Sequence, residues 1–302
     1  RTKPFGFEGV GVIGLNWLKK VKDEFGFKTA TEVANAHHVY AALEADVDIL
    51  WIGARSTVNP FTVQEIAVAL KGTNKPVLVK NPVNPDLALW IGALERLLGQ
   101  DVKNLGAIHR GFSSYQKTKY RNVPNWQIAL DFKNQYPNIP MFVDPSHICG
   151  RRDLLKDITQ EAFNVGYEGA MIESHPNPDA AWSDASQQIT PEVLADMLGS
   201  LQIRNSDISG FDDEMGKHRA LISDIDFQLI SLLSSRMKIS EKIGTLKKQN
   251  NIAIFQPDRW KVITEYANQK ASETGMSQEF IEKVFKAIHE ESIEVQNNIM
   301  ID

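Results

Sequence analysis

The chain has 302 residues, of which 42% are hydrophobic and 24% are charged, and this ordinary globular composition leaves room for one large domain or two unequal ones. The net charge of −5 argues against nucleic acid or a membrane surface as a partner, and no apolar run reaches the roughly 18 residues of a membrane span. The single cysteine, Cys149, excludes an intrachain disulfide framework and fits the reducing cytoplasm, where we expect the protein to be.

Short apolar runs alternate with longer amphipathic stretches from residue 26 to about residue 173. The predicted strands are residues 27–33, 48–52, 76–80, 106–109, 140–144 and 169–173. The predicted helices between them include residues 62–70, 85–98 and 126–135. This alternation is typical of a parallel α/β sheet, and apolar runs such as Val77-Leu78-Val79 suit strands that are covered on both faces.

Six predicted strands are two fewer than the eight of a closed parallel barrel. Two arrangements therefore remain open. Either the sheet is open and doubly wound, or it is a (β/α)₈ (TIM) barrel whose first two strands precede Arg1, which is not an initiator methionine.

The character of the chain changes near residue 204. Residues 204–213 are polar and contain Ser, Asn and Gly, as linkers do. Beyond them, apolar residues follow helical spacing from about residue 215 to 249, and two shorter helices are predicted near 258–272 and 277–300. Because a helix as long as the first one usually needs a partner helix, we expect a domain at 1–203, a linker at 204–213, and an all-α three-helix domain at 214–302 that dimerises by intertwining.

Several polar residues follow the predicted strands directly. Arg55, Lys80 and Arg110 are three cations that could hold a multiply charged anion such as a phosphate or carboxylate. Three further residues offer ligands that suit Mn²⁺, Fe²⁺ or Zn²⁺: His147, Glu173 and Asp184. Any one of the six alone is more often a solvated rim charge or a structural histidine. Six together at the carboxyl ends of strands favour a site at the mouth of a barrel.

Residues 1 to about 201 resemble 3-deoxy-D-arabino-heptulosonate 7-phosphate (DAHP) synthase of the short microbial type. The motifs that carry the resemblance are Ile52-Gly53-Ala54-Arg55, Asp144-Pro145-Ser146-His147 with Gly150-Arg151-Arg152, and Glu173-Ser174-His175-Pro176 followed by Ser183-Asp184. The resemblance implies a (β/α)₈ barrel that condenses phosphoenolpyruvate with erythrose 4-phosphate.

The same resemblance assigns roles to the residues at the strand ends. Phosphoenolpyruvate would be held by Arg55, Lys80 and Arg110, with Lys80 also taking part in catalysis, and a divalent metal would be held by His147, Glu173 and Asp184. We expect Mn²⁺ first, with Fe²⁺, Zn²⁺ or Co²⁺ as alternatives. Arg1-Thr2 matches the end of the family's Lys-Pro-Arg-Thr motif, which contacts erythrose 4-phosphate. The family's fourth metal ligand, a cysteine, would precede Arg1, so we expect the chain as given to bind metal weakly.

A second basic set lies in the helical part of the chain: Arg219, Arg236, Lys247 and Arg259. On a straight helix, Arg219 and Arg236 are separated by roughly 25 Å, so a single chain cannot easily bring both to one ligand. The spacing alone is equally compatible with a solvated basic face. Arg236, however, falls on the apolar side of its helix, where an unpaired charge is costly.

This helical pattern is similar to the all-helical chorismate mutase. The residues that carry the resemblance are Arg219 with Ile225-Asp226, Leu232-Leu233-Ser234-Ser235-Arg236, Ile243-Gly244-Thr245-Leu246-Lys247, Pro257-Asp258-Arg259 and Glu291-Ser292 with Gln296. It implies an intertwined dimer in which Arg219 reaches the partner's site, and no cofactor. Arg219, Arg236 and Arg259 would face the two carboxylates of chorismate, and Lys247 and Gln296 would donate to its ether oxygen, with Ser292 nearby. Trp260 and Gln256 replace residues that are acidic in many relatives, yet we expect turnover.

Together the two resemblances predict a bifunctional enzyme of the shikimate pathway that makes DAHP and converts chorismate to prephenate. Feedback on the barrel by chorismate or prephenate, bound at the helical domain, is a further hypothesis. Two alternatives remain open. The helical domain could be a purely regulatory, dimerising sensor, or the barrel could be a noncatalytic scaffold.

Overall fold

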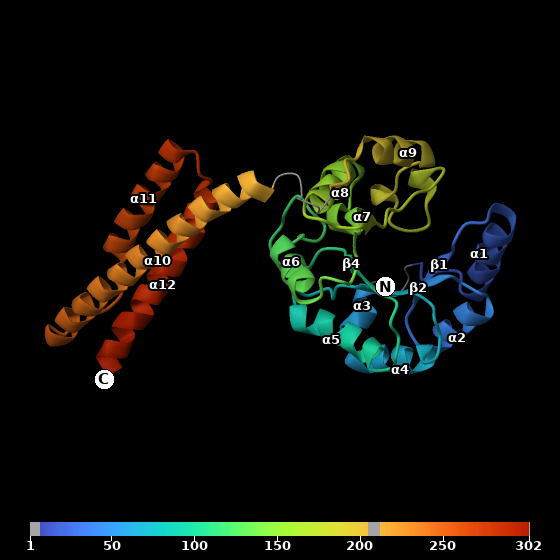
Figure 1. Cartoon of the computed structure of the whole chain (residues 1–302), viewed down its shortest axis with the longest axis horizontal. Helices are drawn as coiled ribbons and strands as arrows, with labels where there is room; N and C mark the ends of the chain where they lie inside the picture. Colours follow the sequence, from blue (N-terminus) through green and yellow to red (C-terminus); the bar gives the residue numbers. More distant parts are fainter. Residues whose placement is uncertain (1–6, 205–211, 302) are drawn as a thin grey trace. The chain divides into compact units, whose positions relative to one another are not determined.

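The computed structural model describes residues 7–204 and 212–301 (Figure 1), and the chain divides into two compact units, Arg1–Ser206 and Asp207–Asp302. Residues 205–211 of the predicted linker lie outside the described residues, and its last two residues, Asp212 and Asp213, belong to α10. The first unit contains, in chain order, α1 (Val12–Phe25), β1 (Ala30–Val33), α2 (Ala36–Glu44), β2 (Ile49–Ile52), α3 (Ala54–Thr57), α4 (Pro60–Leu70), β3 (Val77–Lys80), α5 (Leu87–Leu98), β4 (Leu105–His109), α6 (Trp126–Gln135), β5 (Met141–Val143), α7 (Pro145–Cys149), α8 (Leu155–Asn164), β6 (Gly169–Ala170) and α9 (Pro191–Ser200).

The six strands form one parallel sheet whose spatial order, β1 to β6, is the order of the sequence. A doubly wound sheet reverses its strand order at a switch point, and this sheet does not, so the doubly wound alternative is excluded and the six strands form a parallel half-barrel sheet. Because right-handed crossovers that always advance in one direction place every helix on the same face, α2, α4, α5 and α6 lie along the outside of the strand arc (Figure 1). Within the described residues, β1 and β6 are the edge strands.

The two faces of the sheet differ in burial. Leu50, Ile52, Val77 and Val79 point to the helices and are fully buried, whereas the alternate residues of β2 are only half-buried. The helical layer is tied to the sheet by Trp90 of α5, whose Nε1 donates to the backbone oxygen of Val79 at 3.1 Å.

The inner face of the sheet is lined by a second row of side chains. A Cβ at Gly106 would lie 2.6 Å from Leu78 Cδ2 and 3.3 Å from Phe142 Cε2, which shows that the three residues share this face. Lys80 is two positions beyond Leu78 in β3 and therefore belongs to the inner row at the carboxyl edge of the sheet.

Two helices of the outer layer begin at strong local signals. Asn59 caps α4 and accepts from two backbone N–H groups of its first turn, and Asp86 caps α5 and accepts from one. The predicted strand at 169–173 is shorter than expected, since β6 ends at Ala170. Helix α1 was not among the predicted elements.

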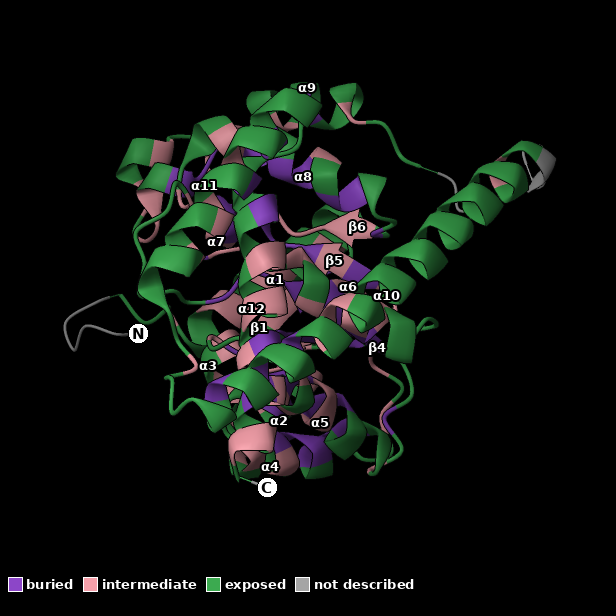
Figure 2. Cartoon of the chain, turned by 90° about the vertical axis from the view of Figure 1, so that its left-hand side faces the viewer, coloured by how far each residue is buried: buried purple, intermediate pink, exposed green. Residues whose placement is uncertain are grey.

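The second unit contains α10 (Asp212–Gln249), α11 (Pro257–Thr274) and α12 (Gln278–Ile301), as the predicted three-helix domain requires. Its buried apolar cluster is small and consists of Ala267, Ala271 and Ile281, with Phe285 packed against it. Within α10, residues 216–235 are all exposed (Figure 2). Among the helices that the structure describes, none has both the length and the hydropathy that a membrane crossing requires.

Candidate active sites

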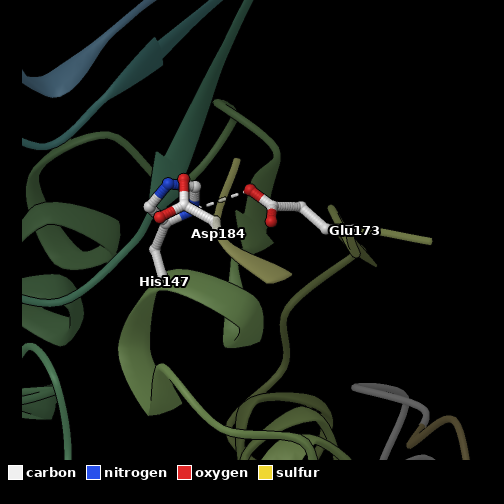
Figure 3. A group of neighbouring side chains, drawn as sticks. All are labelled: His147, Glu173 and Asp184. Carbon is white, nitrogen blue, oxygen red and sulfur yellow. Dashed lines mark ion pairs between the residues drawn. The ribbon is translucent and has the colours of Figure 1, made fainter. Parts of the chain in front are cut away.

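The three predicted metal ligands converge at the carboxyl edge of the sheet (Figure 3). His147 lies in α7 directly after β5, Glu173 follows β6, and Asp184 precedes a short 3₁₀ turn. One ligand atom from each lies within 4.8 Å of the others, and all three residues are half-buried. The sequence places His147 here because Asp144 and Pro145 end the strand and begin α7, with the Asp144 carboxylate accepting from His147 N at 3.1 Å.

Asp144 connects the metal ligands to the anion-binding side of the site. Its Oδ2 lies 2.7 Å from Lys80 Nζ and 2.9 Å from His147 Nδ1. Burial alone would raise the pKa of Asp144, but the charges of Lys80 and His147 and their hydrogen bonds outweigh burial and hold it well below its usual range. An Nδ1–H donated to Asp144 orients the imidazole and leaves the lone pair of Nε2 for a metal.

The chemistry of this cluster fits a divalent cation. Burial raises the pKa of Glu173, and the nearby Asp144 and Asp184 raise it further, against the opposing effects of His147 and Gln187. The negative charge of Glu173 is therefore undercompensated, and a divalent cation between one imidazole and two carboxylates would compensate it. Cys149 is a poor ligand by contrast, because burial raises the pKa of its thiol to about 12.

The three cations predicted to bind an anion lie at or just beyond the carboxyl ends of β2, β3 and β4. Lys80 and Arg110 are each only 7% exposed, and burial lowers the pKa of Arg110 to about 10, which leaves the guanidinium charged at neutral pH. Arg55, on the exposed side of α3, is near enough to lower the pKa of Arg110 further. The predicted acceptor-binding residues Arg1 and Thr2 lie outside the described residues.

Four residues that the sequence reasoning did not single out support this site. Asn81 accepts from the backbone N–H of Arg110 at 2.7 Å, and Asn122 accepts from its Nη1 at 2.8 Å. Arg121 and Gln187 contact the carboxylate ligands. No periodic signal marks Arg121 or Asn122, which lie in a loop, whereas Asn81 directly follows a strand end and could have been included on that ground.

His109 lies on the other side of the sheet. It is fully buried, Nε2 lies 2.6 Å from the backbone oxygen of Pro124, and Nδ1 lies 2.9 Å from the Tyr167 hydroxyl. Because a carbonyl only accepts, Nε2 carries the proton and Nδ1 accepts from Tyr167. Burial lowers the pKa of His109 to about 4, so it is a neutral structural residue.

In the helical unit, four of the predicted residues meet between α10 and α12. Lys247 Nζ donates to Gln296 Oε1 at 3.1 Å and to the backbone oxygen of Ile254 at 2.6 Å, and Arg236 donates to the Ser292 hydroxyl. Burial lowers the pKa of both Arg236 and Lys247.

Two arginines of the predicted set, Arg219 and Arg259, differ in whether they reach this cluster. Arg259 is close enough to lower the pKa of Arg236 further. Arg219 lies 17 residues before Arg236 on α10, roughly 25 Å away along the helix axis, so a single chain does not bring it to this cluster.

Gly244 of α10 allows α10 and α12 to lie close together. A Cβ there would lie 3.2 Å from both Cα and Cγ of Gln296, so a larger residue would push Gln296 away from Lys247. Gln296 Nε2 also donates to the Ser240 hydroxyl at 3.0 Å, which fixes the amide so that its oxygen faces Lys247.

The first unit thus has a parallel half-barrel sheet with a candidate metal cluster and three cations at its carboxyl edge, and the comparisons identify the family to which this arrangement belongs. Residues 1–207 match the model of the DAHP synthetase I family, and residues 218–297 match that of chorismate mutase type II. The chain belongs to the DAHP synthetase I family and carries a chorismate mutase type II domain.

Among curated relatives, the phospho-2-dehydro-3-deoxyheptonate aldolase of Thermotoga maritima is 29% identical over 202 residues, which are 67% of this chain and 58% of that protein. A 2-dehydro-3-deoxyphosphooctonate aldolase of Pseudomonas putida is 28% identical over 233 residues, covering 70% of this chain and 77% of that protein. The crystal structure of the T. maritima DAHP synthase superposes with a TM-score of 0.59 at 27% identity, over 71% of this chain and 59% of that one. The chain thus spans less than two thirds of its T. maritima relative.

Proposed function

We propose that the first unit condenses phosphoenolpyruvate with erythrose 4-phosphate to DAHP. The observation that carries this proposal is the chain of contacts from Lys80 through Asp144 to His147, at 2.7 and 2.9 Å, because it joins an anion clamp to a candidate metal cluster. A noncatalytic scaffold would have no need to bury such charges, which cost stability unless they are paired.

The residues of this site would divide the work as follows. Lys80, Arg110 and Arg55 hold the phosphate and carboxylate of phosphoenolpyruvate and aim its methylene carbon at the aldehyde. A divalent cation on the three ligands, for which Mn²⁺ is our first choice, would polarise the aldehyde oxygen. The new bond joins the methylene carbon to the aldehyde carbon. Water then adds to the former enol carbon, and phosphate leaves by C–O cleavage.

The test is the formation of DAHP and phosphate from the two substrates in the presence of saturating Mn²⁺, with Lys80→Met and Lys103→Met compared. Lys103 is 77% exposed and pairs only with Asp101 in the described contacts, so its replacement is the matched control. We expect Lys80→Met to lose activity by at least about 100-fold and Lys103→Met to keep it. Equal activity of the two variants would contradict the proposal.

We further propose that the helical unit converts chorismate to prephenate. The contact between Lys247 and Gln296 at 3.1 Å supports it, since it holds in place the Lys247 ammonium, a donor that suits the oxygen that gains negative charge as the C–O bond breaks. Lys247→Ala should lower the rate by about 100-fold or more. Lys248→Ala is the control, because Lys248 is the next residue on the helix and donates only to the backbone of Ile299 in the described contacts. Binding of chorismate without conversion would favour the alternative, a regulatory sensor.

We also propose that a second copy of the chain completes the helical site. On α10, Leu221, Ile225 and Leu232 are 60%, 55% and 67% exposed, too much apolar surface for a lone helix, and Arg219 lies on the same segment. If Arg219 acts in the partner's site, mixing Arg219→Ala with Lys247→Ala restores roughly a quarter of the wild-type sites by random pairing. No recovery on mixing would show that Arg219 acts in its own chain or not at all.

Feedback between the units is a separate proposal, supported by the presence of both domains in one chain. Prephenate should lower the rate of DAHP formation in the full chain, and a variant that abolishes binding at the helical site, Arg236→Ala, should remove that inhibition. An unchanged synthase rate with saturating prephenate would end this proposal.

A further inference from the structure

Two of the candidate metal ligands are connected to each other by side chains outside the cluster. Arg121 Nη1 donates to Asp184 Oδ1 at 2.9 Å and to Gln187 Oε1 at 2.6 Å. Gln187 Nε2 in turn donates to Glu173 Oε2 at 3.0 Å. Since Gln187 is fully buried, its amide has a fixed place, and the path from Asp184 to Glu173 is an unbroken chain of hydrogen bonds.

The segment that carries Arg121 is also tied to the third ligand. The backbone N–H groups of Arg121 and Asn122 donate to the carbonyl of Ile148 at 3.0 and 3.1 Å. Asn122 Nδ2 donates to the backbone oxygen of His147 at 2.6 Å. Two adjacent residues in one loop therefore contact the helix of His147 and, through side chains, the other two ligands.

Gly150 allows this loop to lie so close to α7. Its φ of +65° is in the left-handed region, and a Cβ there would lie 2.6 Å from Arg121 Cβ. A glycine at the end of α7 thus permits the turn and leaves room for the arginine stem.

We propose that Arg121 and Gln187 are positioning residues of the metal site: they hold Asp184 and Glu173 in ligand geometry by fixing one oxygen of each carboxylate. The hydrogen bond from Gln187 fixes Glu173 Oε2, and the other oxygen, Oε1, is the one that lies toward His147, 3.6 Å from Nδ1. Partners of this kind set the orientation of metal ligands, and their loss lowers metal affinity by about 10- to 100-fold. The inference rests on the proposed function in that it takes the cluster to be a metal site.

The experiment measures Mn²⁺ affinity directly, by the loss of the electron paramagnetic resonance signal of free Mn²⁺ on titration of the full chain. Arg121→Met and Gln187→Met remove the donors and keep side-chain bulk. Arg151→Met is the matched control, because Arg151 is exposed and pairs with Asp153 rather than with a ligand. Circular dichroism confirms that each variant is folded, and Arg121→Gln replaces Arg121→Met if the latter is not.

We expect about tenfold weaker Mn²⁺ binding in Arg121→Met and in Gln187→Met, and wild-type binding in Arg151→Met. The double variant should bind Mn²⁺ more weakly than either single one, because each residue fixes a different carboxylate. At saturating Mn²⁺ the KM for phosphoenolpyruvate should stay near the wild-type value.

Wild-type Mn²⁺ affinity in a folded Arg121→Met or Arg121→Gln chain would overturn the inference, and so would a wild-type chain that binds no Mn²⁺. A wild-type chain that binds Mn²⁺ but makes no DAHP would contradict the proposed reaction alone, since the affinity differences among the variants would still decide the roles of Arg121 and Gln187.

Discussion

Acid should destabilise the first unit through His109, a residue outside either site. Burial lowers its pKa to about 4, against the opposing hydrogen bond to Pro124, and the charge of Arg110 lowers it further, while Asp144 acts in the opposite direction. In the unfolded chain the pKa of a histidine is about 6.5. Between these two values the unfolded state binds more protons than the folded state, so stability is complete above about pH 6.5 and is lost as the pH falls toward 4.

The size of this effect follows from the two pKa values. Each unit of difference corresponds to about 1.36 kcal/mol, so the difference between 6.5 and about 4 makes the free energy of unfolding about 3 kcal/mol lower at pH 4 than at pH 7.5. The neighbouring Tyr167 hydroxyl does not compensate, because its own pKa is raised by burial and it stays neutral throughout.

The assay is urea unfolding followed by tryptophan fluorescence at several pH values, in the wild type and in His109→Gln. Trp90 and Trp126 report on the region, with ring centroids 6.4 and 5.2 Å from that of His109. Carboxylates titrate in both proteins, so the difference between the two pH profiles isolates His109. The exposed His37 supplies the control variant, His37→Gln, which should follow the wild type. Parallel profiles for wild type and His109→Gln would refute the reasoning.

Three other substitutions test the packing of the two sites. Lys80→Met leaves the buried carboxylate of Asp144 without its closest cation, so urea unfolding should show a loss of about 3–5 kcal/mol, most of which Lys80→Met with Asp144→Asn recovers. Gly244→Ala should lower the mutase kcat more than it raises KM, because the new Cβ displaces Gln296 by a few tenths of an ångström; steady-state kinetics with unchanged kcat would contradict this. Gly150→Ala should cost at least about 1–2 kcal/mol in urea unfolding, since its φ is +65° and the new Cβ would also lie 2.6 Å from Arg121 Cβ.

Much of the first unit could be predicted from the sequence because its strands are short apolar runs bounded by polar turns. Each of the six predicted strands overlaps an observed one. Their neighbour order could not be predicted, since hydrophobic pattern says which residues are covered but not which strand lies beside which. Helix α1 was overlooked although Leu15 and Leu18 pack on the core, because its exposed apolar residues, among them Trp17 at 52%, blur its amphipathic pattern.

In the candidate site, too, some residues could be predicted from the sequence and others could not. Residues such as His147 and Lys80 could be predicted because parallel strands bring their carboxyl ends to one edge; the structure groups them, while their catalytic roles stay predictions. Arg121 contacts Asp184 and Gln187 across 63 and 66 residues of sequence. Such a contact leaves no local pattern, and the order of the intervening strands decides it.

The cations of the two candidate sites are held in different electrostatic settings. In the first unit Lys80 is held by the carboxylate of Asp144, so its charge is partly compensated and its position is fixed before any ligand arrives. In the helical unit, the hydrogen bonds of Arg236 and Lys247 described above go to hydroxyl, amide and backbone oxygens, and burial lowers the pKa of both groups. These charges are compensated less, so an anionic ligand would gain more from them, and the helical unit should depend more on such a ligand for stability than the first unit does.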